Sequence, residues 1–471
     1  MPARGTASGS GLDLLLDSGA LRSRGLEAQL RTAIQTGRLP SGTALPSTRS
    51  LARDLRIARG TAVDAYEQLV AEGYLETRRG SGTRVARGPA PNPPAPPAAG
   101  AAPPPRYDLR PGSPDLTSFP RQEWVAALRR VLRGAPPSVL GYGDPRGSPE
   151  LRVTLARYLG RARGVSATAD RVLVVNGFNQ ALSLWARTLR GRGHHHVAVE
   201  EPTLPLARQL LRHAGFTVHP VPVDEDGLDV DALDGTPATA VLVAPAHQFP
   251  AGSVLHPARR VALVRWAERR DGAIIEDDYD GEFRYDRASV GALQGLNPDR
   301  VLYAGTASKS LAPALRLAWM VAPAPLLKGL TEERALAERE APVLDQLALE
   351  ELMESGVYDR HLRRMRHVYR HRRDRLVELV GRRTPAVRVS GIAAGLHAVL
   401  RLPARADDGE IMAHLAARSV AVSRLRDYQA QPGGAPTLVV GYGTPPEHAI
   451  EAALDAFTRG LAVAPGLGGQ G

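Results

Sequence analysis

A proline-rich stretch at residues 87–107 most constrains how this chain folds. It reads RGPAPNPPAPPAAGAAPPPRY and contains nine prolines in 21 positions. Proline at this density blocks helices and sheet pairing and favours extended polyproline II, a semi-rigid spacer that rises about 3.1 Å per residue. The chain therefore folds as two separate parts. We expect domains at residues 17–87 and 108–465, joined by a linker at residues 88–107.

Composition excludes several classes of protein. The 471 residues exceed what one core usually serves, and 43% of them are hydrophobic, which excludes a wholly disordered chain. The absence of cysteine excludes disulfides, thiolate zinc sites and cysteine nucleophiles. No apolar run approaches the roughly 18–20 residues of a membrane span, and Asp13 interrupts the only apolar patch near the N-terminus. We expect a cytoplasmic protein with no membrane contact and no metal site.

The pattern of residues 17–87 is that of a winged helix-turn-helix. Apolar residues at Leu26, Leu30 and Ile34 give one helical face, which Gly37 and Pro40 end. A second short helix is expected near Thr48–Leu55 and a third at about Thr61–Glu72. The segment YLETRRGSGTRVA then alternates around a Gly-Ser-Gly turn as a β-hairpin does. Three helices followed by a basic hairpin indicate double-stranded DNA as a partner.

The same segment resembles a known DNA-binding family. Residues 37–86, from GRLPSGTALPSTRS to GSGTRVA, are similar to the GntR-type winged helix over essentially its full length. The resemblance implies that Arg49 of LPSTR, Arg59 at the start of the recognition helix and Gly82 of the wing meet DNA. An arginine at a helix N-terminus can reach guanine bidentately, and the wing arginine Arg78 can neutralise a phosphate.

Thr61 has two interpretations. The resemblance implies a phosphate contact. Ala58 stands where the family usually has a serine that caps the recognition helix. Thr61, with Asp64 three residues on, would then replace that cap without touching DNA.

Residues 108–465 alternate helical stretches with short β-branched runs, RVLVV, TAVLVAP, GAIIED and RVLYAG. This alternation predicts an α/β domain with a mostly parallel sheet, whose functional groups lie at the carboxyl ends of the strands. Chemically useful residues follow three of these runs. They are the glycine turn Asn176–Asn179, the acids and phenol of Asp277–Tyr279, and the hydroxyl-rich loop Thr306–Ser310.

Lysine is the scarcest chemical group in the chain. Only Lys309 and Lys328 are lysines among 60 basic residues. Lys309 lies in the hydroxyl-rich loop, seven residues before Arg316. A lysine amine, a carboxylate for a ring nitrogen and a cradle for a phosphate are the three needs of pyridoxal 5'-phosphate (PLP). The sequence therefore predicts a PLP site.

Each group has an expected role at that site. Lys309 forms the Schiff base and is the catalytic residue. Asp277 keeps the pyridine nitrogen protonated, so that the ring draws electrons, and Tyr279 hydrogen-bonds the ring hydroxyl. The phosphate is expected at a helix N-terminus together with hydroxyl and guanidinium donors, from Gly177, Phe178, Asn179, Thr306, Ser308 and Arg316.

Four motifs of this part resemble fold type I aminotransferases, specifically the MocR-type regulators, which fuse a GntR winged helix to such a domain. The motifs are LGYGDPRGSPELRVTLARYLGRARGV, PAHQFPAG, IIEDDYDGEFRY and GTASKSLAPALRLAWMV. The resemblance covers nearly the whole chain outside the N-terminal tail and the linker. It implies an aminotransferase fold with a smaller α+β subdomain and a homodimer. It also implies that Tyr142 approaches the phosphate of the partner subunit's cofactor.

The chain departs from the family at positions that handle ligands. Leu204 stands where an aromatic residue typically stacks on the pyridine ring, and Leu206 where some members place an effector arginine. Phe249 stands where aminotransferases have an asparagine, and TLVVGYGTP lacks their carboxylate-binding arginine. His247 either contacts the cofactor or has no role there. These departures argue against efficient turnover of ordinary amino acids.

Three hypotheses follow. The first is a PLP-dependent, DNA-binding transcriptional regulator whose aminotransferase-like domain senses an amine or amino acid through Schiff-base chemistry. The second is a catalytically competent PLP-dependent aminotransferase with a fused DNA-binding domain. The third is a regulator whose signal is PLP itself. We favour a regulator with little or no net turnover.

Overall fold

The computed structural model describes residues 6–7, 13–14, 23–78, 82–86, 104–285, 290–338, 341–431 and 433–467. The chain divides into two compact units, residues 1–103 and 104–471. Most of the expected linker, residues 88–103, lies outside the described residues, as do residues 17–22, 79–81 and 87 of the expected DNA-binding domain. Within the described ranges, no helix is long and apolar enough to cross a membrane.

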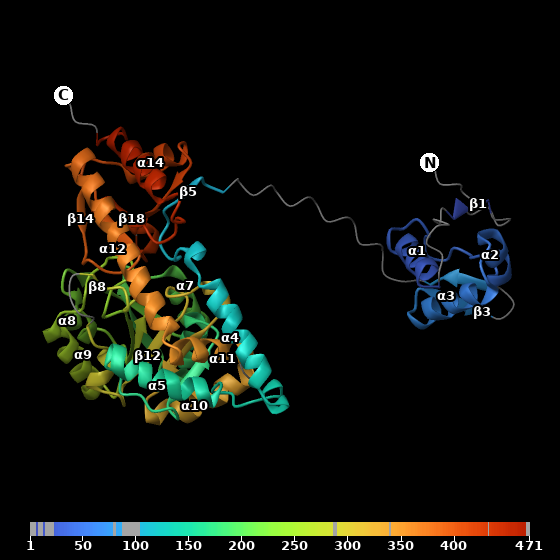
Figure 1. Ribbon diagram of the computed structural model, residues 1–471, viewed down its shortest axis with the longest axis horizontal. Coiled ribbons are helices and arrows are strands. Elements are labelled where there is room, and N and C mark those ends of the chain that lie inside the picture. The colour runs from blue at the N-terminus through green and yellow to red at the C-terminus, as the bar shows by residue number, and fades with distance from the viewer. Residues whose placement is uncertain are drawn as a thin grey trace. The chain divides into compact units, whose positions relative to one another are not determined.

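The first unit is a winged helix-turn-helix (Figure 1). Three helices bury one apolar cluster that includes Leu26, Leu30 and Leu69, and the two wing strands pair antiparallel. The recognition helix begins at Arg59, two residues before the expected start, and ends one residue early. The bounds are α1 Ser23–Gln35, α2 Thr48–Leu55, α3 Arg59–Ala71, β3 Leu75–Arg78 and β4 Gly82–Val85.

The second unit is built on an eight-stranded sheet in which every expected strand is present. The strand order is β6-β13-β12-β11-β10-β7-β8-β9. Neighbours from β12 to β8 pair in parallel, while β13 pairs antiparallel with both β12 and β6. The strands are β6 Val172–Val175, β7 His196–Glu201, β8 Thr217–Asp224, β9 Gly227–Leu228, β10 Ala240–Val243, β11 Ala273–Asp278, β12 Val301–Thr306 and β13 Ala318–Val321.

Helices cover both faces of this sheet because its strands are apolar on both sides. Ile275 packs toward α6 (Phe178–Gly191), α7 (Pro205–His213) and α10 (Ala324–Ala337). Its neighbour Ile274 packs on the opposite face, toward α8 (Val230–Asp234) and α9 (Pro257–Arg269). A further layer consists of α4 (Arg121–Gly134), α5 (Pro149–Arg163) and α11 (Val343–Glu354). Two buried faces explain the near-continuous apolar runs of these strands.

A smaller α+β subdomain completes the second unit. Its antiparallel sheet has the order β14-β15-β18-β17. The long helix α12 runs from the layer beside the large sheet into this subdomain (Figure 1). The remaining bounds are β5 Tyr107–Asp108, α12 Val357–Arg383, β14 Arg388–Ser390, β15 His397–Arg401, α13 Asp408–Ala416, β16 Val420–Ala421, β17 Ser423–Arg424, β18 Thr437–Gly441 and α14 Ile450–Ala462. The predicted aminotransferase fold with a smaller subdomain is confirmed.

Candidate functional site

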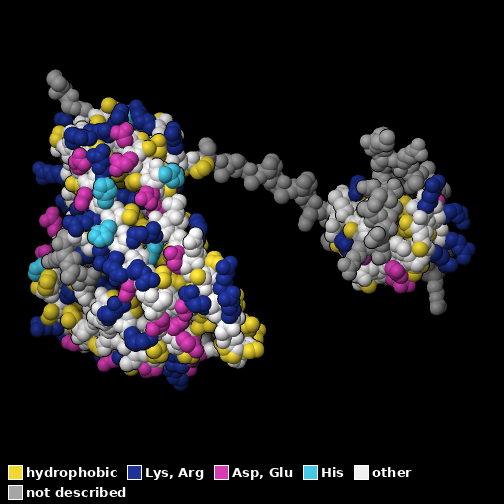
Figure 2. Space-filling model, viewed as in Figure 1, with side chains coloured by type: hydrophobic (Ala, Val, Ile, Leu, Met, Phe, Trp, Pro, Cys, Tyr) yellow, Lys and Arg dark blue, Asp and Glu magenta, His cyan; other side chains and the backbone are white. Residues whose placement is uncertain are grey.

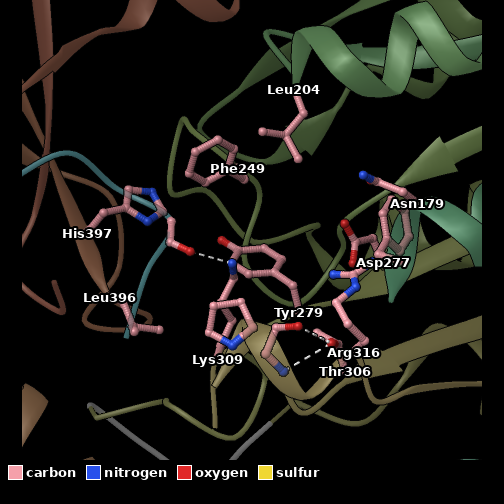
Figure 3. Close-up of a pocket in the computed structure, with 14 residues that line it drawn as sticks. Asn179, Leu204, Phe249, Asp277, Tyr279, Thr306, Lys309, Arg316, Leu396 and His397 are labelled. Carbon is pink, nitrogen blue, oxygen red and sulfur yellow. Dashed lines mark hydrogen bonds between the residues drawn. The ribbon is translucent and has the colours of Figure 1, made fainter. Parts of the chain in front are cut away.

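A cavity of about 220 Å³ lies where several strands of the large sheet end (Figure 3). It brings together groups that are up to 285 residues apart in the chain, as expected for the carboxyl edge of a mostly parallel sheet. Eight of the predicted cofactor residues line it. The lining residues are Gly112, Phe178, Asn179, Leu204, Phe249, Asp277, Tyr279, Thr306, Ser308, Lys309, Pro313, Arg316, Leu396 and His397.

Strand β11 sends its two terminal carboxylates to opposite faces. Asp278 is held by Arg163, whose Nε and Nη2 donate to it at 2.6 and 2.9 Å. The Tyr303 hydroxyl donates to the same carboxylate at 2.7 Å, and Asp278 and Arg163 are each only 1% exposed. Because successive strand residues alternate between faces, fixing Asp278 turns Asp277 toward the cavity. Asp278 is therefore structural, and Asp277 is available to a ligand.

The Asp277 carboxylate is suited to a cationic ligand group. No hydrogen bond from a described residue holds it. Burial first, and then the charges of Asp278, Asp280 and Glu200, raise the pKa of Asp277 well above its usual range, and Lys309 partly offsets them. A protonated ring nitrogen placed against Asp277 would supply the missing counter-charge. The carboxylate thus fits the pyridine nitrogen of PLP.

Lys309 presents its amine in the same cavity. Its Nζ donates to the backbone carbonyl of Gly112 at 2.5 Å. Burial lowers the pKa of Lys309, and the charges of Asp277 and Asp280 oppose that shift. A lowered pKa increases the neutral fraction of the amine, and only the neutral amine is a nucleophile. Lys309 is accordingly prepared to condense with an aldehyde.

The opposite end of the cavity is an anion cradle. Helix α6 begins at Phe178, so the first N–H groups of the helix, at Phe178 and Asn179, have no partner within it. Arg316 donates to the Asn176 carbonyl and lies against Gly177. The Thr306 hydroxyl donates to Ser308 Oγ at 2.9 Å, beside the guanidinium (Figure 3). Backbone N–H groups, a guanidinium and hydroxyls are the donors that a phosphate needs.

Gly177 does not line the cavity, but its lack of a side chain leaves room for the guanidinium of Arg316. Its φ is +103°, and a Cβ there would lie 2.5 Å from Nη2 of Arg316. We therefore expect Gly177→Ala to displace the guanidinium and to weaken PLP binding by at least about tenfold, since one charge-assisted contact contributes about 1.5–3 kcal/mol. Absorbance titration of the apoprotein with PLP measures this effect.

The control for that prediction is Gly191→Ala at the other end of the same helix. A Cβ at Gly191 meets nothing within 4 Å. Its affinity for PLP should match that of the unaltered protein. Equal affinity of Gly177→Ala and Gly191→Ala would show that the cradle is not where the phosphate binds.

A buried polar cluster stands behind Tyr279. Nδ1 of His247 lies 2.8 Å from Asp280 Oδ2 and 3.0 Å from the Tyr279 hydroxyl. Burial, reinforced by Asp280 and Asp277, raises the pKa of Tyr279 well above its usual range, so the phenol keeps its proton. Burial, followed by the neighbouring His247, lowers the pKa of His397 to about 3. His247 does not line the cavity, and its contact with the site is through the Tyr279 hydroxyl.

The cavity also contains residues that sequence reasoning did not single out. Gly112, Leu396 and His397 line it, although they come from segments with no recognisable motif, and so does Pro313, which lies in the Lys309 motif but was given no role. Of the predicted cofactor residues, Tyr142 lies elsewhere and is 80% exposed. Leu204 and Phe249, noted as departures from the family, both line the cavity.

The candidate DNA surface belongs to the first unit. Arg49 and Arg59 lie in the first turns of α2 and α3, and both are exposed. The buried Tyr66 hydroxyl donates to the Pro46 carbonyl at 3.0 Å, which fixes the turn before α2 against α3. Arg78 and Gly82 are exposed and face each other across the wing, and Gly82 has a φ of +78°.

The alternative cap at Thr61 is wrong. Helix α3 begins at Arg59 with Ala58 as its N-cap, and no side chain caps it. Thr61 lies already in the third helical position, and its N–H donates to the Ala58 carbonyl. Its hydroxyl cannot replace a cap because the first turn starts before it. The predicted phosphate contact of Thr61 stays a prediction.

Fold and cavity together define the class to which the second unit belongs, the class I and II aminotransferases. Residues 109–447 match the family model described as "Aminotransferase class I and II", and residues 22–85 match "Bacterial regulatory proteins, gntR family". The chain therefore belongs to the MocR-type transcriptional regulators, which join a GntR domain to an aminotransferase domain. This confirms the resemblance seen in the sequence.

Named relatives share both parts. The chain is 34% identical to the HTH-type pyridoxine biosynthesis transcriptional regulator PdxR of Corynebacterium glutamicum, over 90% of this chain and 92% of that protein. It is 35% identical to the probable rhizopine catabolism regulatory protein MocR of Rhizobium meliloti, over 76% and 77% of the two chains.

A solved structure resembles the second unit. The α-aminoadipate aminotransferase LysN of Thermus thermophilus, complexed with N-(5'-phosphopyridoxyl)-L-leucine, has a TM-score of 0.68 and 26% identity, over 75% of this chain and 92% of that chain. PLP is the cofactor of class I and II aminotransferases. The unpaired Asp277, the amine of Lys309 and the anion cradle fit its ring nitrogen, aldehyde and phosphate.

Proposed function

We propose that this chain is a PLP-dependent transcriptional regulator whose second unit senses a small amine, an amino acid or PLP itself through Lys309. One observation carries the proposal. The nucleophilic amine of Lys309 and the unpaired carboxylate of Asp277 share one cavity, in a chain that also carries a DNA-binding winged helix. Bound PLP supplies an electrophilic carbon that condenses with amines and a ring that draws electrons.

Different residues of the cavity bind different groups of PLP. Asp277 holds a proton at the ring nitrogen, and Tyr279 donates its retained proton to the ring hydroxyl. Lys309 supplies the amine. The phosphate is bound by the start of α6 and its surroundings, with Gly177, Phe178, Asn179, Thr306, Ser308 and Arg316 as the residues concerned. Tyr142 is assigned to the partner subunit's site.

DNA binding is assigned to the first unit. Arg59, at the N-terminus of α3, enters a groove of the DNA. Arg49, at the N-terminus of α2, does the same. The DNA backbone beside these arginines is contacted by Thr61, Arg78 and Gly82. This assignment is supported by the exposure of both arginines at helix N-termini, where side chains of a helix-turn-helix reach base edges.

Arginine substitutions test this assignment. We expect Arg59→Ala to weaken binding to a selected duplex by about 1–3 kcal/mol, or roughly 5- to 150-fold, because a bidentate base contact is lost. Arg78→Ala should lower the slope of log affinity against log salt by about 0.9, the contribution of one phosphate contact. Fluorescence anisotropy at several salt concentrations measures both.

Arg31→Ala is the control, because its guanidinium is already paired with Glu27 and Glu72. It should leave affinity and salt slope unchanged. If Arg59→Ala bound the selected duplex as tightly as Arg31→Ala, the recognition helix would be misassigned.

A second copy of the chain is the proposed partner of an apolar surface on α4. Val125 and Leu132 lie seven residues apart on one face of α4, and Leu140 follows, all of them exposed. Hydrophobic side chains gather at the C-terminal end of α4, at the lower right of the second unit (Figure 2). Exposed apolar patches of this kind mark association surfaces. A homodimer would cover this surface.

We expect the protein to sediment as a dimer at micromolar concentration and Leu132→Arg to shift it toward the monomer, because a buried guanidinium without a partner opposes association. Val463→Arg places the same charge on an exposed apolar residue after α14 and should remain dimeric. A monomeric unaltered protein, or two variants that behave alike, would contradict the assignment.

An active aminotransferase is the second candidate, because the amine, the acid and the phenol of such a site are all present. The two candidates differ in turnover. A regulator should show altered cofactor absorbance with amines but release almost no keto acid. Keto acid released at ordinary enzyme rates of about 1–10³ s⁻¹ would favour the enzyme.

PLP itself is the third candidate signal. It is favoured by the name of one relative, a regulator of pyridoxine biosynthesis. If PLP alone changes the affinity of the protein for DNA, without any amine, this candidate is correct.

A further inference from the structure

The geometry points to a specific class of effector, a primary amine with an apolar body and no carboxylate group. This inference rests on the proposed function, because it concerns what binds beside PLP and Lys309. It narrows the open choice between amines and amino acids. The charges and the apolar side chains of the cavity carry it.

No cationic side chain among the described lining residues is available to pair with the carboxylate of an effector. Among the described lining residues only Asp277, Lys309 and Arg316 are charged. Lys309 is the group with which the effector competes, and Arg316 lies at the phosphate end, where it donates to the Asn176 carbonyl. Burying a carboxylate without a partner is costly, so an amino acid binds such a site poorly.

The two histidines near the cavity do not supply that cation. The very low pKa of His397, caused first by burial and then by His247, leaves its ring neutral at physiological pH. His397 is further held by a contact of 3.2 Å between its Nε2 and the Pro250 carbonyl. His247 is directed at the buried carboxylate of Asp280.

The field at the Lys309 amine is negative. Asp277 and Asp280 both act on Lys309 in the direction that stabilises a positive charge. Such a field disfavours an anionic carboxylate on an arriving amine, whose amino group reacts in its neutral form. The electrostatics therefore separate an amine from the corresponding amino acid.

The rest of the wall is apolar. Leu204 and Phe249 lie on one side of the cavity, and Leu396 lies on another (Figure 3). The Phe249 ring packs edge-on against Tyr428 and His397, with centroids 5.1 Å apart in each pair. These contacts fix the ring, so that it offers a rigid apolar surface. An aliphatic or aromatic body suits this wall.

Matched pairs of compounds test the inference on the PLP-loaded full chain. Isoamylamine is compared with L-leucine, and 2-phenylethylamine with L-phenylalanine, since each pair differs only by the carboxylate. The readout is the visible absorbance of bound PLP. We expect each amine to alter it at a concentration at least tenfold below that of its amino acid. The inference would be overturned if an amino acid altered the absorbance at the same concentration as its amine or at a lower one. It would also be overturned if neither amine had any effect.

A variant supplies the missing cation. Leu204→Arg places a guanidinium at the cavity wall, where Leu204 is 38% exposed, so that a longer side chain has room. It should reduce the preference for the amine by at least fivefold. Leu296→Arg adds the same charge at an exposed leucine outside the cavity and should leave the preference unchanged. An unchanged preference in Leu204→Arg would count against the inference.

The visible absorbance band of bound PLP distinguishes failure of the proposed function from failure of this inference. If the protein with added PLP shows no visible band that depends on Lys309, the proposed function and the inference fall together. If the band is present and amino acids act as strongly as amines, only the inference falls.

Discussion

Lys309→Ala is expected to abolish the visible absorbance that the protein acquires with PLP. Lys309 is the only described amine in the cavity, where its Nζ meets the Gly112 carbonyl and the charge of Asp277. Without it no side chain there can form a Schiff base. The measurement is an absorbance spectrum after addition of PLP and removal of the unbound cofactor by gel filtration.

Lys328→Ala is the matched control, because it removes the other lysine of the chain. Lys328 is 89% exposed on α10, and its Nζ lies 3.8 Å from Glu332. Its loss should leave the spectrum unchanged. Retention of the visible band in Lys309→Ala, or its loss in Lys328→Ala, would refute the site.

Asp278→Asn should lower the free energy of unfolding of the second unit by about 3–5 kcal/mol. The substitution leaves the guanidinium of Arg163 buried without its counter-charge, and a broken buried pair costs about that much. All four tryptophans belong to residues 104–471, so tryptophan fluorescence during urea unfolding reports on this unit alone.

Asp234→Asn is the control for this prediction. Asp234 pairs with Arg269 and Arg270, each at 3.3 Å, but is half exposed. Exposed pairs contribute less than about 1 kcal/mol, so this change should be small. If the two substitutions destabilised the unit equally, Asp278 would not be the anchor that orients Asp277.

Much of the fold and the site could be predicted from the sequence because the information is local. The runs before Asn176, Asp277 and Thr306 are apolar and β-branched, and each is a strand in the sheet. Parallel strands bring their carboxyl ends to one edge, which is why distant motifs meet in one cavity. The scarcity of lysine then left one candidate for the amine.

The rest depends on tertiary contacts that no local pattern encodes. The sequence predicts Asp277 for the ring nitrogen, but the pair Asp277-Asp278 does not encode the contact that turns Asp278 to the opposite face. Arg163, 115 residues away, supplies that contact. Gly112, Leu396 and His397 reach the cavity from outside any motif. The start of α3 at Arg59, which excludes Thr61 as a cap, is likewise not marked by any capping side chain.

The most direct test of the central claim is the affinity of the full chain for a duplex selected from a random pool, measured with and without PLP and 2-phenylethylamine. The account predicts that these ligands change the affinity of the unaltered protein at least fivefold. It also predicts that they leave Lys309→Ala, which should still bind DNA through its first unit, unchanged. An affinity that is the same under all conditions, or that responds equally in Lys309→Ala, would contradict the account.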